Sequence, residues 1–120
     1  MVDDEQDLTY TLKVILEEDG SFQVETFTDP ALALSEFKAG MYDLAVLDIR
    51  MPAMNGFQLY RKLKDVDNML KICFLTAAEL LYYQETDSDI IDDLGTDCFV
   101  QKPSDNEYFV KNIEAILSQN

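Results

Sequence analysis

Two hydrophobic patterns alternate along this chain. Short and almost continuous apolar runs, such as Leu44-Ala45-Val46-Leu47, are typical of strands that are buried on both faces of a sheet. Between these runs, apolar residues recur at helical spacing. The runs predict strands over residues 22–27, 43–47, 71–75 and 98–100. The helical spacing predicts helices over residues 6–18, 29–40, 56–64, 79–94 and 105–117.

Strands that alternate with helices predict an α/β domain with a parallel sheet and right-handed crossovers. The carboxyl ends of parallel strands meet at one edge of the sheet, where open α/β sheets bind their ligands. Five polar residues are expected at this edge, because each follows an apolar segment: Asp3, Asp4, Asp48, Thr76 and Lys102. Several strand ends that supply acids, a hydroxyl and an amine favour a chemical site over simple packing.

Asp48 is the most informative of these residues. It ends the apolar run, and the Pro52 and Asn55-Gly56 that follow it are typical of a loop. A carboxylate held on a rigid strand end suits metal binding or nucleophilic phosphoryl chemistry. A strand-end Asp can equally cap the next turn, so Asp48 by itself leaves both interpretations open.

Composition narrows the classes of function. The 120 residues fit one domain, and 48% of them are apolar, which excludes a disordered acidic tail. The formal net charge is −15, which argues against direct binding of nucleic acid or anionic membranes. The chain has no histidine, so Ser-His, Cys-His and His-metal catalysis are excluded. Cys73 and Cys98 lie in apolar runs, which predicts buried free thiols and a cytoplasmic protein.

The residues at the predicted edge resemble the receiver domain of two-component response regulators. The resemblance rests on four segments and extends over essentially the whole chain, residues 1–120. These segments are Val2-Asp3-Asp4-Glu5, Asp48-Ile49-Arg50-Met51-Pro52-Ala53-Met54-Asn55-Gly56, Leu75-Thr76-Ala77 and Val100-Gln101-Lys102-Pro103. It implies a flavodoxin-like (βα)5 three-layer sandwich with sheet order 2-1-3-4-5.

The resemblance also implies a phosphoprotein that is not an enzyme. Asp48 would accept a phosphoryl group from a sensor histidine kinase, with Lys102 and Thr76 contacting the transferred oxygens. Mg²⁺ would bind Asp4 and Asp48 directly, Asp3 through water, and the Arg50 backbone carbonyl. Thr76 and Phe99 would form the switch that couples this site to a partner surface. Phe99 can instead be an ordinary core residue.

Two features depart from the family pattern. Only Met1 and Val2 precede the acid pair, so the first strand is truncated in a position that is interior in the expected sheet. Another segment, such as a second copy of the chain, could fill that place. The stretch between Thr76 and Lys102 is also longer than usual, and its Tyr82-Tyr83 pair can be a partner surface or a cover for the core.

Two other functions, a phosphatase and a binding module, are alternatives to a phosphoacceptor domain. A phosphatase of the haloacid-dehalogenase type would need a second Asp two residues after Asp48, where this chain has Arg50. A degenerate receiver that acts as a phosphorylation-independent binding module is the main alternative. The expected partners are a sensor histidine kinase and either a downstream protein target or a second copy of the chain. No direct contact with nucleic acid or membrane is expected.

Overall fold

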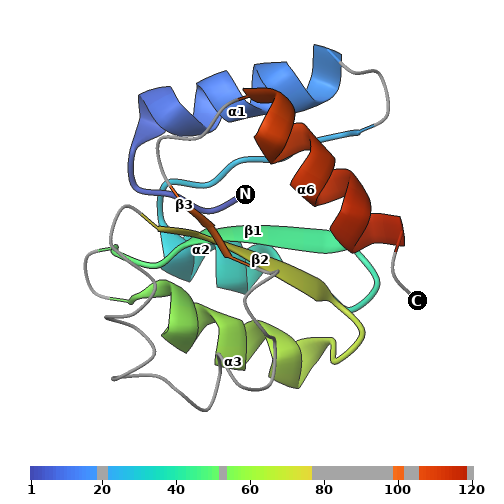
Figure 1. The fold of residues 1–120 in the computed structure, drawn as a ribbon. Helices are drawn as coiled ribbons and strands as arrows, with labels where there is room; N and C mark the ends of the chain where they lie inside the picture. Colours follow the sequence, from blue (N-terminus) through green and yellow to red (C-terminus); the bar gives the residue numbers. More distant parts are fainter. Residues whose placement is uncertain (19–21, 52–53, 77–98, 102–105, 119–120) are drawn as a thin grey trace.

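The computed structural model describes residues 1–18, 22–51, 54–76, 99–101 and 106–118 (Figure 1). Within them, three parallel strands form one sheet in the order β1-β2-β3: β1 is Leu44–Asp48, β2 is Lys71–Thr76 and β3 is Phe99–Gln101. The register places Asp48 beside Leu75, and Leu75 beside Val100. The carboxyl ends of the three strands therefore lie at the same edge, as the sequence predicts.

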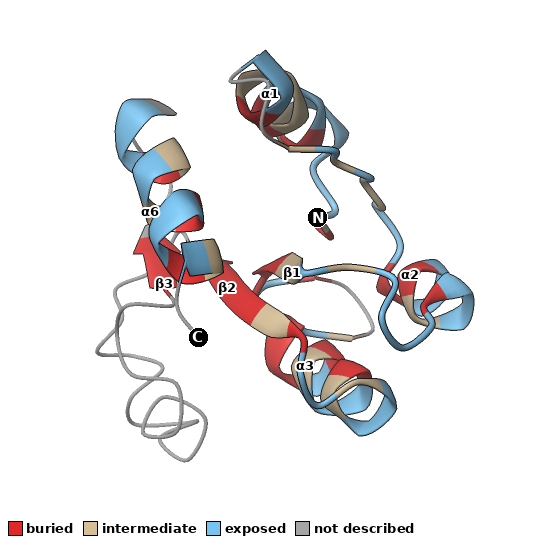
Figure 2. Ribbon diagram, turned by 90° about the vertical axis from the view of Figure 1, so that its right-hand side faces the viewer, coloured by how far each residue is buried: buried red, intermediate tan, exposed pale blue. Residues whose placement is uncertain are grey.

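Helices cover both faces of this sheet. One layer consists of α1 (Gln6–Glu18) and α6 (Asn106–Ser118), and the other of α2 (Pro30–Glu36) and α3 (Gly56–Val66) (Figures 1 and 2). Alternate strand residues face the two layers, so Val46 packs in the α1–α6 core and Leu47 in the α2–α3 core. None of the helices in the described part of the chain is long and apolar enough to cross a membrane.

Local sequence explains where two helices begin. The Asp29 side chain accepts a hydrogen bond from the Ala31 N–H, and Pro30 occupies the first turn of α2. At α3, Asn55 and Gln58 form a reciprocal capping box, with N–H to side-chain oxygen distances of 2.9 Å in both directions. Both starts agree with the turn signals of the sequence.

The truncated first strand is present as a single residue. Val2 forms isolated parallel bridges to Phe27 on one side and to Leu47 on the other. It thus occupies the first-strand position of the expected 2-1-3-4-5 order, between the second and third. The predicted strand over residues 22–27 is reduced to the bridge at Phe27. That prediction was wrong in length, because a strand needs a neighbour to pair with and Val2 offers only a short one.

The other differences lie at the ends of elements. The helix predicted to run to Gly40 ends at Glu36, because Phe37 takes an extended backbone. The strand predicted over residues 43–47 is shifted by one residue, since β1 includes Asp48, and α3 continues two residues further than predicted, to Val66. Cys73 is a buried thiol, as expected. Cys98, the predicted helix over residues 79–94 and the Tyr82-Tyr83 pair lie outside the described residues.

Candidate functional site

Three carboxylates meet at the carboxyl edge of the sheet. One oxygen from each of Asp3, Asp4 and Asp48 lies within 4.8 Å of the others. Asp3 and Asp48 are buried, with exposed fractions of 0% and 4%, whereas Asp4 is exposed. The site therefore has two sheltered acids and one at its solvent side. The sequence predicted that these three residues converge.

Val2 is the residue that brings the acids together. Its N–H donates to the Val46 carbonyl at 2.8 Å, and its carbonyl accepts from the Asp48 N–H at 2.9 Å. On the other side, the Asp3 N–H donates to the Phe27 carbonyl at 3.1 Å. These backbone bonds fix the start of the chain beside the end of β1. A short bridge is thus sufficient to hold Asp3 next to Asp48.

Clustered carboxylates repel one another and favour a bound cation. Hard divalent ions such as Mg²⁺ prefer oxygen ligands, and one or two carboxylates with several waters form a usual Mg²⁺ site. The donor set of Asp3, Asp4 and Asp48 fits this chemistry. The Asp3 carboxylate also accepts a hydrogen bond from the Glu5 N–H at 2.9 Å, which orients it within the cluster.

Gly56 shapes the loop that follows Asp48. The Gly56 N–H donates to the Ile49 carbonyl at 2.9 Å, which returns the loop to the end of β1. A Cβ atom at Gly56 would lie 2.5 Å from the Asp48 backbone oxygen and 3.0 Å from the Ile49 Cα. Only glycine allows this approach. Gly56 belongs to a motif of the sequence, but no local pattern predicted its steric role.

The backbone places the ends of the other strands near the acids. Thr76 is the last residue of β2 and is one position beyond Leu75, the register partner of Asp48. It pairs with Gln101, the last residue of β3. Lys102 follows directly in the sequence but lies outside the described residues, as does the side chain of Thr76. The roles expected for these two side chains stay predictions.

Arg50 is exposed in the loop after β1, two residues beyond Asp48.

Phe99 is buried in a cluster of aromatic rings on the α3 side of the sheet. Its ring centroid lies 5.1 Å from that of Phe74 and 6.4 Å from that of Phe57. This packing gives Phe99 the contacts of a core residue. Its expected role as a switch stays a prediction.

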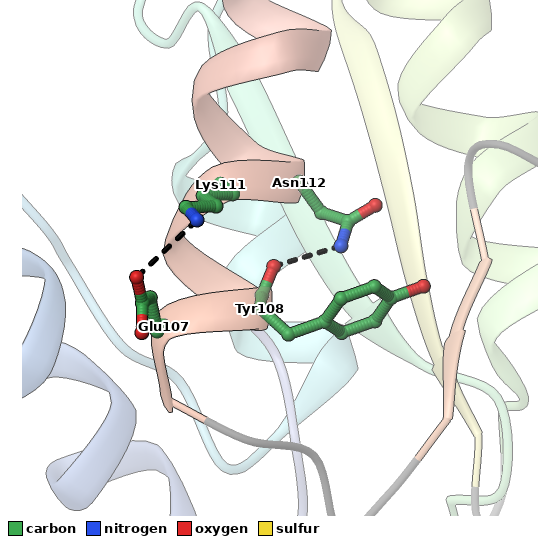
Figure 3. A network of polar contacts seen from close by, with 4 residues as sticks. All are labelled: Glu107, Tyr108, Lys111 and Asn112. Carbon is green, nitrogen blue, oxygen red and sulfur yellow. Dashed lines mark hydrogen bonds and ion pairs between the residues drawn. The ribbon is translucent and has the colours of Figure 1, made fainter.

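The last helix, α6, presents a polar, exposed face at its first turns. Lys111 forms an ion pair with Glu107 at 3.2 Å, and the Asn112 amide donates to the Tyr108 carbonyl at 2.8 Å (Figure 3). The Tyr108 side chain is 55% exposed. Both polar contacts join residues four positions apart, which is the usual spacing of helix surface pairs. They stabilise the helix itself and leave the Tyr108 ring accessible.

Comparison with known proteins identifies the family. The model of the response regulator receiver domain matches residues 1–114. The chain belongs to the receiver domain family. In the structural comparison, the non-phosphorylated HemR receiver domain from Leptospira biflexa is 30% identical, with a TM-score of 0.82, and the match covers 99% of this chain and 92% of that one. The flavodoxin-like fold expected from the sequence is thereby confirmed.

Two further relatives are informative. The response regulator TrrA from Thermotoga maritima, solved in complex with Mg²⁺-BeF, is 29% identical with a TM-score of 0.78; the match covers 96% of this chain and 94% of that one. The heme response regulator HssR of Staphylococcus epidermidis is 33% identical over 98% of this chain and 50% of its own length. The chain spans about half the length of the curated relatives it matches.

Proposed function

We propose that this receiver domain accepts a phosphoryl group on Asp48 from a phosphohistidine of a sensor kinase. The observation that supports the proposal is the convergence of Asp3, Asp4 and Asp48 at the strand end, with Asp48 on a rigid strand. Carboxylates form covalent intermediates in phosphoryl transfer, and a charge-neutralising environment makes this possible.

In the transfer step, a carboxylate oxygen of Asp48 attacks the phosphorus and a new P–O bond forms. The P–N bond to the donor imidazole breaks, and the imidazole nitrogen retains the electron pair and takes up a proton. Mg²⁺ held by Asp3, Asp4, Asp48 and the Arg50 carbonyl would neutralise the charge on the phosphoryl oxygens. Asp3 and Asp4 would thus help to hold the cation, and Asp48 would form the covalent bond to phosphorus.

We assign supporting roles to two residues that follow the neighbouring strands. The Lys102 ammonium would pair with a phosphoryl oxygen, and the Thr76 hydroxyl would donate a hydrogen bond to another. The strand register supports these two roles, because it aligns the ends of β1, β2 and β3. Movement of Thr76 toward the phosphoryl group would free space next to Phe99. Rotation of that ring would then change the surface offered to a protein partner.

The test is phosphorylation by acetyl phosphate with Mg²⁺, followed by the mass of the intact protein. In this reaction the P–O bond to acetate breaks in place of the P–N bond. Wild-type protein should gain one phosphoryl group, and Asp48→Asn should gain none. Asp65→Asn is the matched control, because Asp65 is an exposed acid on α3 away from the cluster. An adduct of undiminished yield in Asp48→Asn would refute the assignment.

The same experiment separates the alternative function. A phosphorylation-independent binding module would give no adduct in the wild-type protein, although the fold would be intact. Circular dichroism on the same samples checks the fold. A folded wild-type protein without an adduct would therefore favour the binding module.

A further inference from the structure

The start of α3 is joined to the end of β1 through backbone atoms. The Gly56 N–H donates to the carbonyl of Ile49, the residue directly after Asp48, at 2.9 Å. Gly56 also approaches Asp48 so closely that an added Cβ would lie 3.1 Å from the Asp48 carbonyl carbon. Backbone atoms in such contact have no rotamers through which they could yield. A displacement of the strand end at Asp48 is therefore passed to Gly56 and its helix.

Phe57, the residue after Gly56, is held firmly at the start of α3. The capping box of Asn55 and Gln58 fixes the backbone on both sides of Phe57. Its side chain is 1% exposed and belongs to the α2–α3 core. Because the capping box holds the backbone and the core holds the ring, a displacement of Gly56 also moves the Phe57 ring.

The Phe57 ring lies against rings of the two neighbouring strands. Its centroid is 5.0 Å from that of Phe74 on β2 and 6.4 Å from that of Phe99 on β3, at interplanar angles of 52° and 50°. Phe74 and Phe99 are register partners, and their rings stack at an angle of 26°. Tilted aromatic pairs depend on orientation, because they bring the positive edge of one ring toward the negative face of the other. A rotation of Phe57 therefore changes which orientation of Phe99 is most stable.

Phe99 is the least enclosed of these three rings. It is 9% exposed, whereas Phe74 and Phe57 are 0% and 1% exposed. It lies on β3, the last strand of the described sheet, whereas Phe74 lies on β2, which has a strand on each side. Motion in a packed cluster concentrates in the member with the lowest local contact density. A rearrangement of the three rings is therefore expected to appear at Phe99.

We propose that Phe57 is a positioning residue that couples the phosphorylation of Asp48 to the orientation of Phe99. This inference rests on the proposed function, in which Asp48 accepts the phosphoryl group. Phosphorylation adds charge at the strand end and changes the contacts of the loop that follows it. Gly56 transfers the displacement to Phe57, whose ring selects between orientations of Phe99. This coupling does not need the Thr76 hydroxyl, so Phe99 responds also in a protein without it.

The experiment records fluorine NMR spectra of protein labelled with para-fluorophenylalanine, and the mass of the intact protein is measured on the same sample. Acetyl phosphate with Mg²⁺ supplies the phosphoryl group. The chain has seven phenylalanines, and the Phe99 signal is the one that Phe99→Leu removes. In the wild-type protein this signal should shift on phosphorylation. An adduct without a shift would overturn the coupling alone, whereas absence of the adduct would overturn the proposed function and the coupling together.

Two variants locate the coupling at Phe57. In Phe57→Leu, the shift of the Phe99 signal at equal adduct yield should fall at least about twofold, because the tilted ring is lost. Tyr60→Leu is the matched control, since Tyr60 lies one turn after Gly56 on α3 and its ring also packs against Phe74, at 5.8 Å. This variant should keep the wild-type shift. An equal loss in both variants would make Phe57 an ordinary structural residue and overturn the proposal.

Thr76→Ala separates this coupling from the movement of Thr76. At equal adduct yield it should still shift the Phe99 signal, and its combination with Phe57→Leu should give the smallest shift of all variants. Loss of the whole shift in Thr76→Ala would overturn the proposal, because the hydroxyl would then be required. Phe57→Met also lacks a ring, and it replaces Phe57→Leu where circular dichroism shows that the leucine variant is unfolded.

Discussion

The two edges of the sheet are built differently, although the same residue, Val2, borders both. At the carboxyl edge, the isolated bridges of Val2 and the backbone bond of Asp3 to Phe27 hold two buried acids beside each other. At the amino edge, a pocket of about 880 Å³ lies beside β1 and is lined by Met1 and Val2. The comparison indicates that the site needs only the last residues of the first strand.

The largest expected effect comes from completing the amino edge. Fusion of Val-Leu-Val-Val before Met1 should raise the free energy of unfolding by roughly 3–6 kcal/mol, from two or three newly buried apolar side chains. Denaturant unfolding measures the change. Phosphorylation of Asp48 by acetyl phosphate should stay within about twofold of the wild-type rate. A large change in that rate would mean that the two edges are coupled.

A glycine at each edge sharpens the contrast. Gly56→Ala should destabilise the fold by about 1–3 kcal/mol, because its Cβ would collide with the Asp48 backbone oxygen. At the amino edge, Gly40 has a φ of 79° and open space around it. Gly40→Asn should therefore cost well below 1 kcal/mol, since Asn tolerates left-handed backbone. Denaturant unfolding compares the two, and a smaller cost at Gly56 would contradict the steric argument.

Mg²⁺ should raise the stability of the protein by binding only at the carboxyl edge, where the three acids lie. At ten times its Kd, bound Mg²⁺ should add about 1.4 kcal/mol by mass action. Thermal melts with and without Mg²⁺ measure the shift, which Asp4→Ala should remove and Asp65→Ala should keep. No shift in the wild-type protein would argue that the three acids do not bind the ion.

The smallest expected effect is a pH dependence at the amino edge. The Asp67 carboxylate accepts hydrogen bonds from the backbone N–H groups of Gly40 and Met69, both at 3.0 Å, and these bonds lower the pKa of Asp67. Because the folded pKa is lowered, the stabilisation is present above the ordinary pKa and is lost as the pH falls. Asp67→Asn should reduce the loss of stability in acid, measured by melts between pH 6 and pH 3. An equal loss of stability between pH 6 and pH 3 in Asp67→Asn and in the wild-type protein would contradict stabilisation by these hydrogen bonds.

Local sequence determined the layers of the fold, the starts of two helices and the choice of Asp48. The alternation of apolar runs and helical spacing predicted the layers, because burial on both faces of a strand leaves no polar positions. Asp29 and Asn55 fixed helix starts through hydrogen bonds to residues two or three positions away. Asp48 could be selected from the sequence, because the carboxyl ends of parallel strands must meet at one edge.

Tertiary structure decided what depends on neighbours distant in sequence. The segment 22–27 has strand-like residues but only one bridge, because its partner is short. The clash at Gly56 depends on a backbone atom of Asp48, and the burial of Phe99 depends on Phe57 and Phe74. The pocket at the amino edge is lined by residues of α1, α2, α3, β1 and α6, which only the fold brings together. No local pattern contains that information, since pairing and packing are properties of segments brought together by the fold.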